Sequence, residues 1–204
     1  INSVGVFNLA KLAKSQVKVL LTGEGADETH GGYPRFTRIN FFYLISKILQ
    51  KKIIPLSFVS KRFKLFEFKK IFKLDLNDII ILSSSLHSYK DISNMIPKLN
   101  LLNGLDARRG IIKSINLPNK QKSLIYEMKT YMHDLFIRAD KMAMAHSIEN
   151  RVPFLDNDLV DYSLSYLANS NFDYSLFPNV SKNTKKYLKK ISTKYFGKQF
   201  SYRA

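Results

Sequence analysis

Val17-Lys-Val-Leu-Leu-Thr-Gly-Glu-Gly-Ala-Asp-Glu28 joins a short apolar run to a loop of glycines and acids. Its first part, Val17 to Leu21, is β-branched and apolar, which predicts a buried strand. Asn2 to Lys14, just before it, carries apolar residues at helical spacing. A helix that leads into a buried strand indicates an α/β fold, with a parallel sheet flanked by helices.

The acidic loop follows at the carboxyl end of this strand, where ligands bind in parallel sheets. Its carboxylates, Glu24, Asp27 and Glu28, repel one another unless a positive group lies between them. Gly23 and Gly25 let the backbone approach a ligand closely. Mg²⁺ prefers one or two carboxylates together with phosphate oxygens, so the loop predicts a magnesium and phosphate site. The alternative is a solvated acidic loop without a function, and the position after the strand favours the site.

A second informative stretch, Arg138 to Asp156, lies far downstream. Apolar spacing predicts one helix over Gln121 to Arg138 and another over Asp140 to Glu149. Val152-Pro153 ends the helical run, because a residue before proline avoids helical angles. Asp156 is then a suitable N-cap for the next helix.

The charges of this second stretch allow two interpretations. Asp140, Glu149 and Arg151 form either a charge network beside a ligand or a purely structural one. Met144 and the small residues around it are expected in the core. Because isolated acids need cations and a buried arginine needs acids, we expect the Glu24–Asp27 loop and the Asp140–Arg151 segment to face one cleft.

Composition restricts the class of protein. The 204 residues fit one domain or a piece of a larger one, and the chain does not begin with Met, which suggests a fragment. The sequence contains no cysteine, which fits a reducing cytoplasm, and no apolar run of the ~20 residues that span a membrane. The net charge of +17 would suit nucleic acid, but the lysines are scattered, so compositional drift explains the charge better.

The two stretches resemble the glutamine-hydrolysing asparagine synthetase family, in its C-terminal synthetase domain. The similarity rests on Val17 to Glu28 followed by Gly31-Gly32-Tyr33, then on Arg138 to Glu149 and Arg151 to Asp156. It implies an ATP-pyrophosphatase fold of the adenine-nucleotide alpha hydrolase type, with a mostly helical C-terminal part. We expect a partial synthetase domain over 1–204, divided into a sheet segment with the acidic loop (1–35), a helical or irregular segment (36–120) and a helical segment (121–204).

The resemblance also implies a ligase reaction. Members of the family use ATP and Mg²⁺ to convert a carboxylate to an acyl-adenylate with release of pyrophosphate. Ammonia, delivered from glutamine by an N-terminal glutaminase domain, then attacks. Aspartate is the expected acceptor, and related amidotransferases or lactam synthetases that act on another carboxylate are the alternative. The resemblance implies a cytoplasmic protein and leaves a homodimer open.

Four residues of the first motif acquire expected roles from the resemblance. Thr22 and Gly23 stand where the family contacts ATP. Glu24 stands at the position that is important for forming or consuming the acyl-adenylate. Asp27 stands at the position of a magnesium ligand. Thr22 replaces the usual serine and keeps its hydroxyl group.

The resemblance implies less definite roles for the residues of the second motif. Parts of the family's sequence pattern are also missing from this sequence. Glu149 and Arg151 belong to the motif that lines the family's site, while Lys141 stands where arginine is common. The sequence has no Ser-Gly-Gly-x-Asp-Ser phosphate loop, and the family's catalytic lysine would follow Ala204. We therefore expect this chain alone to be inactive. Its rivals are a non-catalytic, basic, nucleic-acid-binding helical domain and a catalytically dead remnant.

Overall fold

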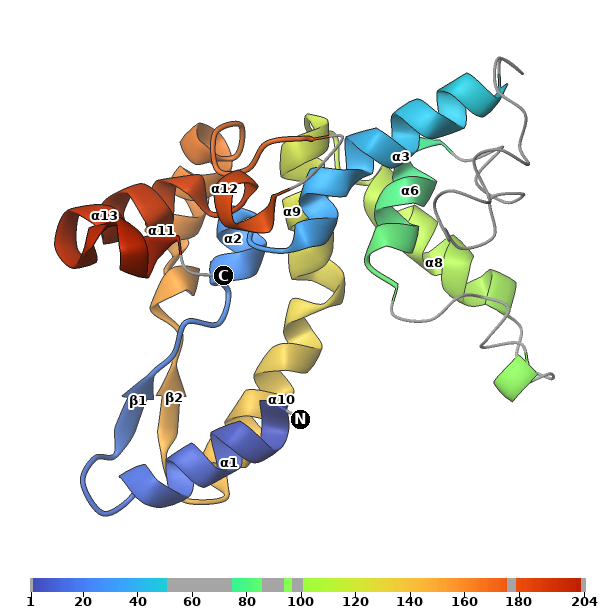
Figure 1. The fold of residues 1–204 in the computed structure, drawn as a ribbon. Helices are drawn as coiled ribbons and strands as arrows, with labels where there is room; N and C mark the ends of the chain where they lie inside the picture. The colour runs from blue at the N-terminus through green and yellow to red at the C-terminus, as the bar shows by residue number, and fades with distance from the viewer. Residues whose placement is uncertain (1, 51–74, 86–93, 97–100, 176–178, 203–204) are drawn as a thin grey trace.

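The computed structural model describes residues 2–50, 75–85, 94–96, 101–175 and 179–202, which are mostly helical with one small parallel sheet (Figure 1). Much of the segment expected to be helical or irregular lies outside these ranges. In chain order the elements are α1 (Asn2–Ala13), β1 (Val19–Leu21), α2 (Ala26–His30), α3 (Pro34–Gln50), α6 (Leu76–Ser83), α8 (Leu101–Lys113), α9 (Asn119–Thr130), α10 (Met132–Met144), β2 (Glu149–Arg151), the 3₁₀ helix η1 (Pro153–Leu155), α11 (Asn157–Tyr162), the π-helix η2 (Ser163–Leu167), α12 (Val180–Asn183) and α13 (Lys186–Ser201).

The sheet is a parallel pair of strands that are far apart in the sequence. Val19 lies opposite Glu149, and Leu21 lies opposite Arg151. Hydrogen bonds extend the pairing at both ends, with the Thr22 N–H donating to the Arg151 carbonyl at 2.9 Å and the Glu149 N–H donating to the Lys18 carbonyl at 2.8 Å. The parallel direction agrees with the sequence prediction.

The predicted burial of this strand is wrong. Only Val19–Leu21 forms the strand, and its two outer residues are exposed, with 71% of Leu21 accessible. The physical reason is that only one face of the pair is covered. Leu20 packs on that face against Ala10, Ala143 and Ile148, which come from α1, α10 and the turn before β2.

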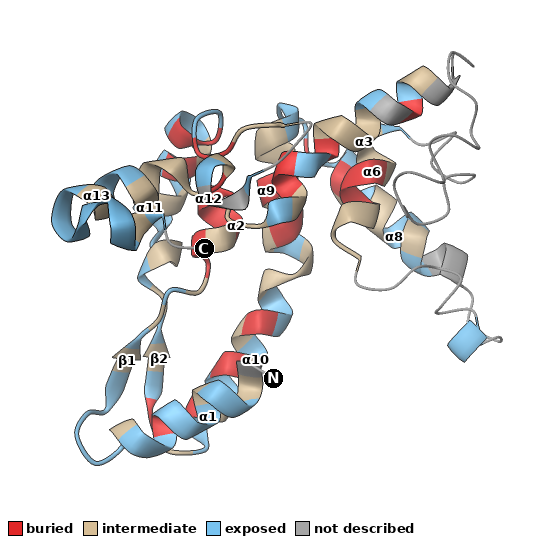
Figure 2. Ribbon diagram, in the orientation of Figure 1, coloured by how far each residue is buried: buried red, intermediate tan, exposed pale blue. Residues whose placement is uncertain are grey.

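The larger core lies among the helices above the sheet, where most of the fully buried side chains gather (Figure 2). α2 packs on α9, α3 packs on α6, and α6 packs on α8. The large, fully buried side chains include Phe36, Ile80, Leu124, Tyr126 and Phe172. Within the described ranges, no helix combines the length and the hydropathy needed to cross a bilayer.

The second motif differs from its predicted helices. The break between α9 and α10 falls at Tyr131, and the second predicted helix, Asp140 to Glu149, ends at Met144. Ser147 then adopts a left-handed conformation with φ 58°, and the chain enters β2. Pairing with β1 therefore overrides the helical pattern. Met144 is 53% exposed, so its predicted place in the core is also wrong.

The N-cap at the end of this motif is confirmed. The carboxylate of Asp156 accepts hydrogen bonds from the backbone N–H groups of Asp158 at 3.1 Å and Leu159 at 3.3 Å. These bonds satisfy two donors that the first turn of α11 would otherwise leave without partners.

We expect opposite effects from alanine at two glycines. Gly31 has φ 65°, and a Cβ there would overlap the Phe172 ring, so Gly31→Ala should lower the free energy of unfolding by about 1–3 kcal/mol. Gly110 lies exposed within α8 with no atom near its Cβ position, so Gly110→Ala should raise it by about 0.5–1 kcal/mol. Urea unfolding measures both. Equal effects would show that the contact with Phe172 does not matter.

Candidate functional site

The acidic loop is held at the end of β1 by a glycine that nothing larger could replace. Gly25 has φ 85° and precedes α2, and a Cβ there would overlap the side chain of Leu155. Leu155 belongs to the Arg-Val-Pro-Phe-Leu-Asp corner of the second motif. The corner therefore packs directly against the start of α2.

The two motifs lie side by side, and whether they face one cleft stays a prediction. The β1–β2 pairing joins them, and the ring of Phe154 in η1 meets the edge of His30 in α2 at 5.8 Å between centroids. Glu149 and Arg151 are exposed and pair with each other at 2.7 Å. Asp140 lies exposed on α10. The motifs are neighbours, but the charges chosen from the sequence do not all converge.

Two oxygens of the loop have no hydrogen-bond partner in the described part of the chain. They are the hydroxyl oxygen of Thr22 and one carboxylate oxygen of Glu24, and both are buried. Burial raises the pKa of Glu24, the positive charge of Arg138 opposes this shift, and the negative charge of Glu28 adds to it. Such unsatisfied buried oxygens are uncommon in proteins and fit a site that binds a polar ligand.

Glu28 has a structural environment. It is buried and accepts a hydrogen bond from the Tyr33 hydroxyl at 2.5 Å. Burial is the largest cause of the raised pKa of Tyr33, and this hydrogen bond is the next largest. The guanidinium of Arg35 stacks on the Tyr33 ring at 3.8 Å and pairs with the buried Glu127 at 2.9 Å. The Gly-Gly-Tyr segment thus fixes the acidic loop to α9.

Asp27 pairs with Lys185 at 2.9 Å, and both side chains are partly exposed. Within the ranges that the structure describes, no group of three or more His, Cys, Asp or Glu side chains is arranged to hold a metal. Arg138 and Lys185 were not singled out from the sequence as site residues. Both lie more than a hundred residues from the loop, and no local pattern connects them to it.

A cluster of buried polar side chains lies on α2 and η2, next to the acidic loop. The Thr29 hydroxyl donates to the Gly25 carbonyl at 2.7 Å and lies 2.8 Å from the Nδ1 of His30. Ser163, in the π-helix η2, donates to the Thr29 carbonyl at 2.6 Å. Burial, with a smaller contribution from the charge of Lys185, lowers the pKa of His30 to about 4.

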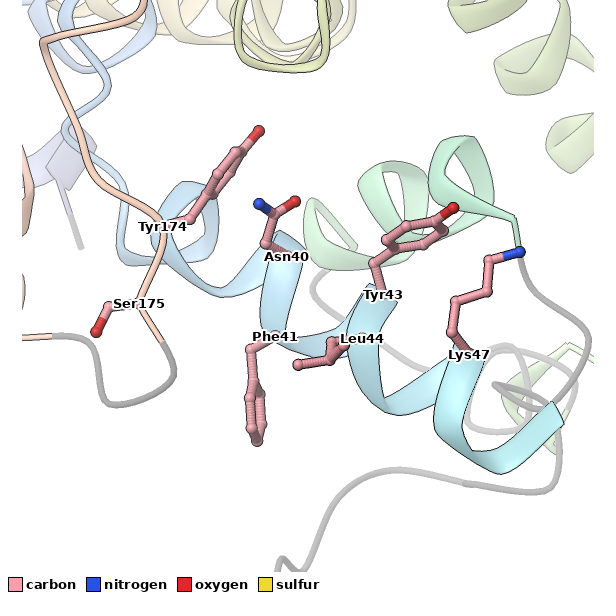
Figure 3. Close-up of a pocket in the computed structure, with 7 residues that line it drawn as sticks. All are labelled: Asn40, Phe41, Tyr43, Leu44, Lys47, Tyr174 and Ser175. Atoms are coloured by element: carbon pink, nitrogen blue, oxygen red, sulfur yellow. The ribbon is translucent and has the colours of Figure 1, made fainter. Parts of the chain in front are cut away.

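A separate hollow of about 390 Å³ lies along α3 (Figure 3). Asn40, Leu44, Lys47 and Tyr174 are among its lining residues, and none of the lining residues is acidic. Burial raises the pKa of Tyr174 to about 12. This hollow does not include any residue of the acidic loop, and its lining does not suit a magnesium ion.

Comparison with known proteins gives the family. The sequence model for asparagine synthase matches residues 2–204, almost the whole chain. The chain belongs to the asparagine synthase family. The resemblance seen in the two motifs is therefore confirmed.

The relatives of this family member are longer proteins. The glutamine-hydrolysing asparagine synthetase 1 of Bacillus subtilis is 29% identical over 170 residues, which cover 78% of this chain and 26% of that protein. The amidase chry2 of Gibberella zeae is 25% identical over 187 residues, covering 79% of this chain and 28% of the amidase. The chain thus spans about a quarter of each. No solved structure gives a significant match. None of these findings supports a nucleic-acid-binding domain.

The buried histidine should make the fold sensitive to acid. Its folded pKa of about 4 lies below its usual value of 6.5, so between these values the unfolded chain binds more protons. The free energy of unfolding should therefore fall by on the order of 2 kcal/mol as the pH falls from 6.5 to 4. Urea unfolding across this range measures the loss.

A matched pair of variants isolates His30. His30→Gln should remove most of this pH dependence, whereas His133→Gln, at an exposed position on α10, should keep it. Comparable slopes for the two variants would assign the acid sensitivity to other groups.

Proposed function

We propose that this chain is part of an ATP-dependent ligase that activates a carboxylate as an acyl-adenylate and transfers ammonia to it. The observation that carries the proposal is the pair of buried, unpartnered oxygens on Thr22 and Glu24, at the carboxyl end of β1. They lie on a loop that packs against the second family motif. A loop in this position is where α/β proteins bind ligands.

In this proposal the nucleotide binds at Thr22 and Gly23. The Thr22 hydroxyl supplies an oxygen that needs a partner, and the position of a Cβ at the exposed Gly23 meets nothing within 4 Å. The backbone is therefore accessible to a ligand. Glu149 and Arg151, one strand away, line the same region and remain open to solvent.

Glu24 is the proposed catalytic residue. Its carboxylate is partly buried, has a raised pKa and faces the charge of Arg138. A carboxylate with a raised pKa is a better proton acceptor than an ordinary carboxylate. This suits a residue that acts while the acyl-adenylate is formed or consumed. In the second of these steps ammonia attacks, and a proton must leave its nitrogen.

Asp27 is the proposed ligand for Mg²⁺. Its carboxylate is partly exposed, and its present partner is an ammonium group that a divalent cation can displace. The metal would neutralise charge on the phosphate oxygens of ATP. Asp27 would be one ligand among several. Mg²⁺ prefers one or two carboxylates, with phosphate oxygens and water as its other ligands.

The proposed acceptor is aspartate, and the proposed source of ammonia is a glutaminase domain of the complete protein. The names of two relatives, asparagine synthetases 1 and 3 of Bacillus subtilis, support this choice. The similarity to an amidase, chry2, favours a different carboxylate as the alternative. A panel of carboxylic acids, tested for acid-dependent pyrophosphate release, separates the two. We place the protein in the cytoplasm, in keeping with a sequence without cysteine.

Two variants of the complete gene product test the assigned roles. Glu24→Gln should lower the kcat of acceptor-dependent pyrophosphate release by about 10²–10³-fold with little change in the KM for ATP. Asp27→Asn should instead raise the Mg²⁺ concentration needed for half-maximal rate. Asp134→Asn, at an exposed position on α10, is the control and should behave as wild type. A Glu24→Gln enzyme with normal kcat would refute the catalytic role.

The chain of 204 residues should not form the amide by itself. Its sequence has no Ser-Gly-Gly-x-Asp-Ser loop to orient the triphosphate, and lost positioning costs several kcal/mol of barrier, on the order of 7 or more in favourable cases. The assay supplies ATP, Mg²⁺, ammonia and aspartate, and measures asparagine and pyrophosphate. Turnover by this chain would show that another segment takes over the role of the missing loop.

A further inference from the structure

Lys185 reaches the acidic loop from the far end of the chain. Its ammonium nitrogen lies 2.9 Å from Oδ1 of Asp27, and the pair joins α2 to the start of α13. Lys186, the next residue, pairs instead with Asp173 at 2.8 Å. Two neighbouring lysines therefore have different partners, and only the first lies at the candidate site.

The backbone around Asp27 leaves room for this pair. The Gly32 N–H donates to the Asp27 carbonyl at 2.9 Å, which brings the glycine against the ion pair. A Cβ at Gly32 would overlap both the carboxylate of Asp27 and the Cε of Lys185. Any residue larger than glycine at position 32 would therefore overlap the ion pair of Asp27 and Lys185.

The conformation of Lys185 is unusual for its residue type. It is left-handed, with φ 47° and ψ 38°, directly before α13. Bonds on both sides hold the backbone there, since the Lys186 N–H donates to the Asn171 carbonyl and the Lys185 carbonyl accepts from the Lys189 N–H. Backbone strain in a non-glycine residue persists where the surroundings impose it, and such strain clusters at functional sites.

Each carboxylate of the loop has a different companion. Glu28 accepts from Tyr33, Glu24 faces the charge of Arg138, and Asp27 pairs with Lys185. Of the three, only the pair of Asp27 and Lys185 is a direct, partly solvent-exposed ion pair. It is therefore the contact that an incoming cation can exchange at the least cost, because exposed ion pairs are weak.

We propose that Lys185 is a positioning residue that holds the Asp27 carboxylate until magnesium and a nucleoside triphosphate bind. The inference rests on the proposed function, because it takes Asp27 as the magnesium ligand. With Mg²⁺ bound, the Asp27 carboxylate would hold the metal, and the Lys185 ammonium group would be free to bind phosphate oxygens. Lysine suits this exchange because it carries a compact charge on a long, flexible stem. No covalent step is involved.

The exchange predicts opposite changes in two affinities. Lys185→Met removes the competitor for Asp27, so Mg²⁺ alone should bind about two- to fivefold more tightly. The same variant loses a cation for phosphate, so a non-hydrolysable ATP analogue with Mg²⁺ should bind more weakly. Isothermal titration calorimetry on the complete gene product measures both affinities without relying on turnover.

Three controls separate this role from a structural one. Lys186→Met removes the same charge one residue away and should change neither affinity. Lys185→Arg keeps the charge and should restore nucleotide binding. In an Asp27→Asn background, Lys185→Met should have no further effect on Mg²⁺ affinity. Circular dichroism shows whether each variant is folded, and Lys185→Arg tests the role even if Lys185→Met unfolds.

The outcomes distinguish the two proposals. If wild type binds the nucleotide with Mg²⁺ and Lys185→Met matches Lys186→Met in both affinities, the role of Lys185 is wrong and the proposed function stands. If wild type binds neither Mg²⁺ nor the nucleotide, both are wrong at this site. Opposite shifts confined to the Lys185→Met variant support the exchange.

Discussion

The pairing of β1 with β2 is the constraint on which the rest of the site depends. It is only three residues long on each strand, yet it joins segments that lie more than a hundred residues apart. Because the pairing is parallel, both strands end at the same edge. The acidic loop and the Arg-Val-Pro-Phe-Leu-Asp corner therefore leave the sheet together, and η1 packs on α2 as a result. The same pairing brings α10 next to α1. Leu20 packs there against the small core of Ala10, Ala143 and Ile148.

Local patterns predicted part of this arrangement. The first helix, the direction of the strand pairing, the place of the acidic loop and the Asp156 cap each depend on residues close in the sequence. The strand Glu149–Arg151, which begins at the last residue of a predicted helix, does not, because its cause is a partner strand far upstream. The pairing of Asp27 with Lys185 was missed for the same reason: a scattered lysine has no local signal that marks its partner.

The electrostatics of the loop explain why so many acids can lie together in a strongly basic protein. Many lysines in the described part of the chain are exposed, and three cations lie beside acids in or near the loop. Arg138, Lys185 and Arg35 accompany Glu24, Asp27 and Glu127 respectively, the first by its charge alone and the other two through direct ion pairs. What distinguishes Glu24 is that one of its oxygens is left without a partner among the described residues. This difference separates the paired acids from Glu24, the acid proposed to react.

The contact between Gly25 and Leu155 has a consequence for how members of this family can diverge. The left-handed glycine admits the leucine side chain where its own Cβ would be, so the two positions fill one volume. A larger residue at position 25 is compatible only with a smaller one at position 155 and with a changed turn. Related sequences should therefore vary at these two positions together or at neither, and this covariation would record the contact between the two motifs across evolutionary time.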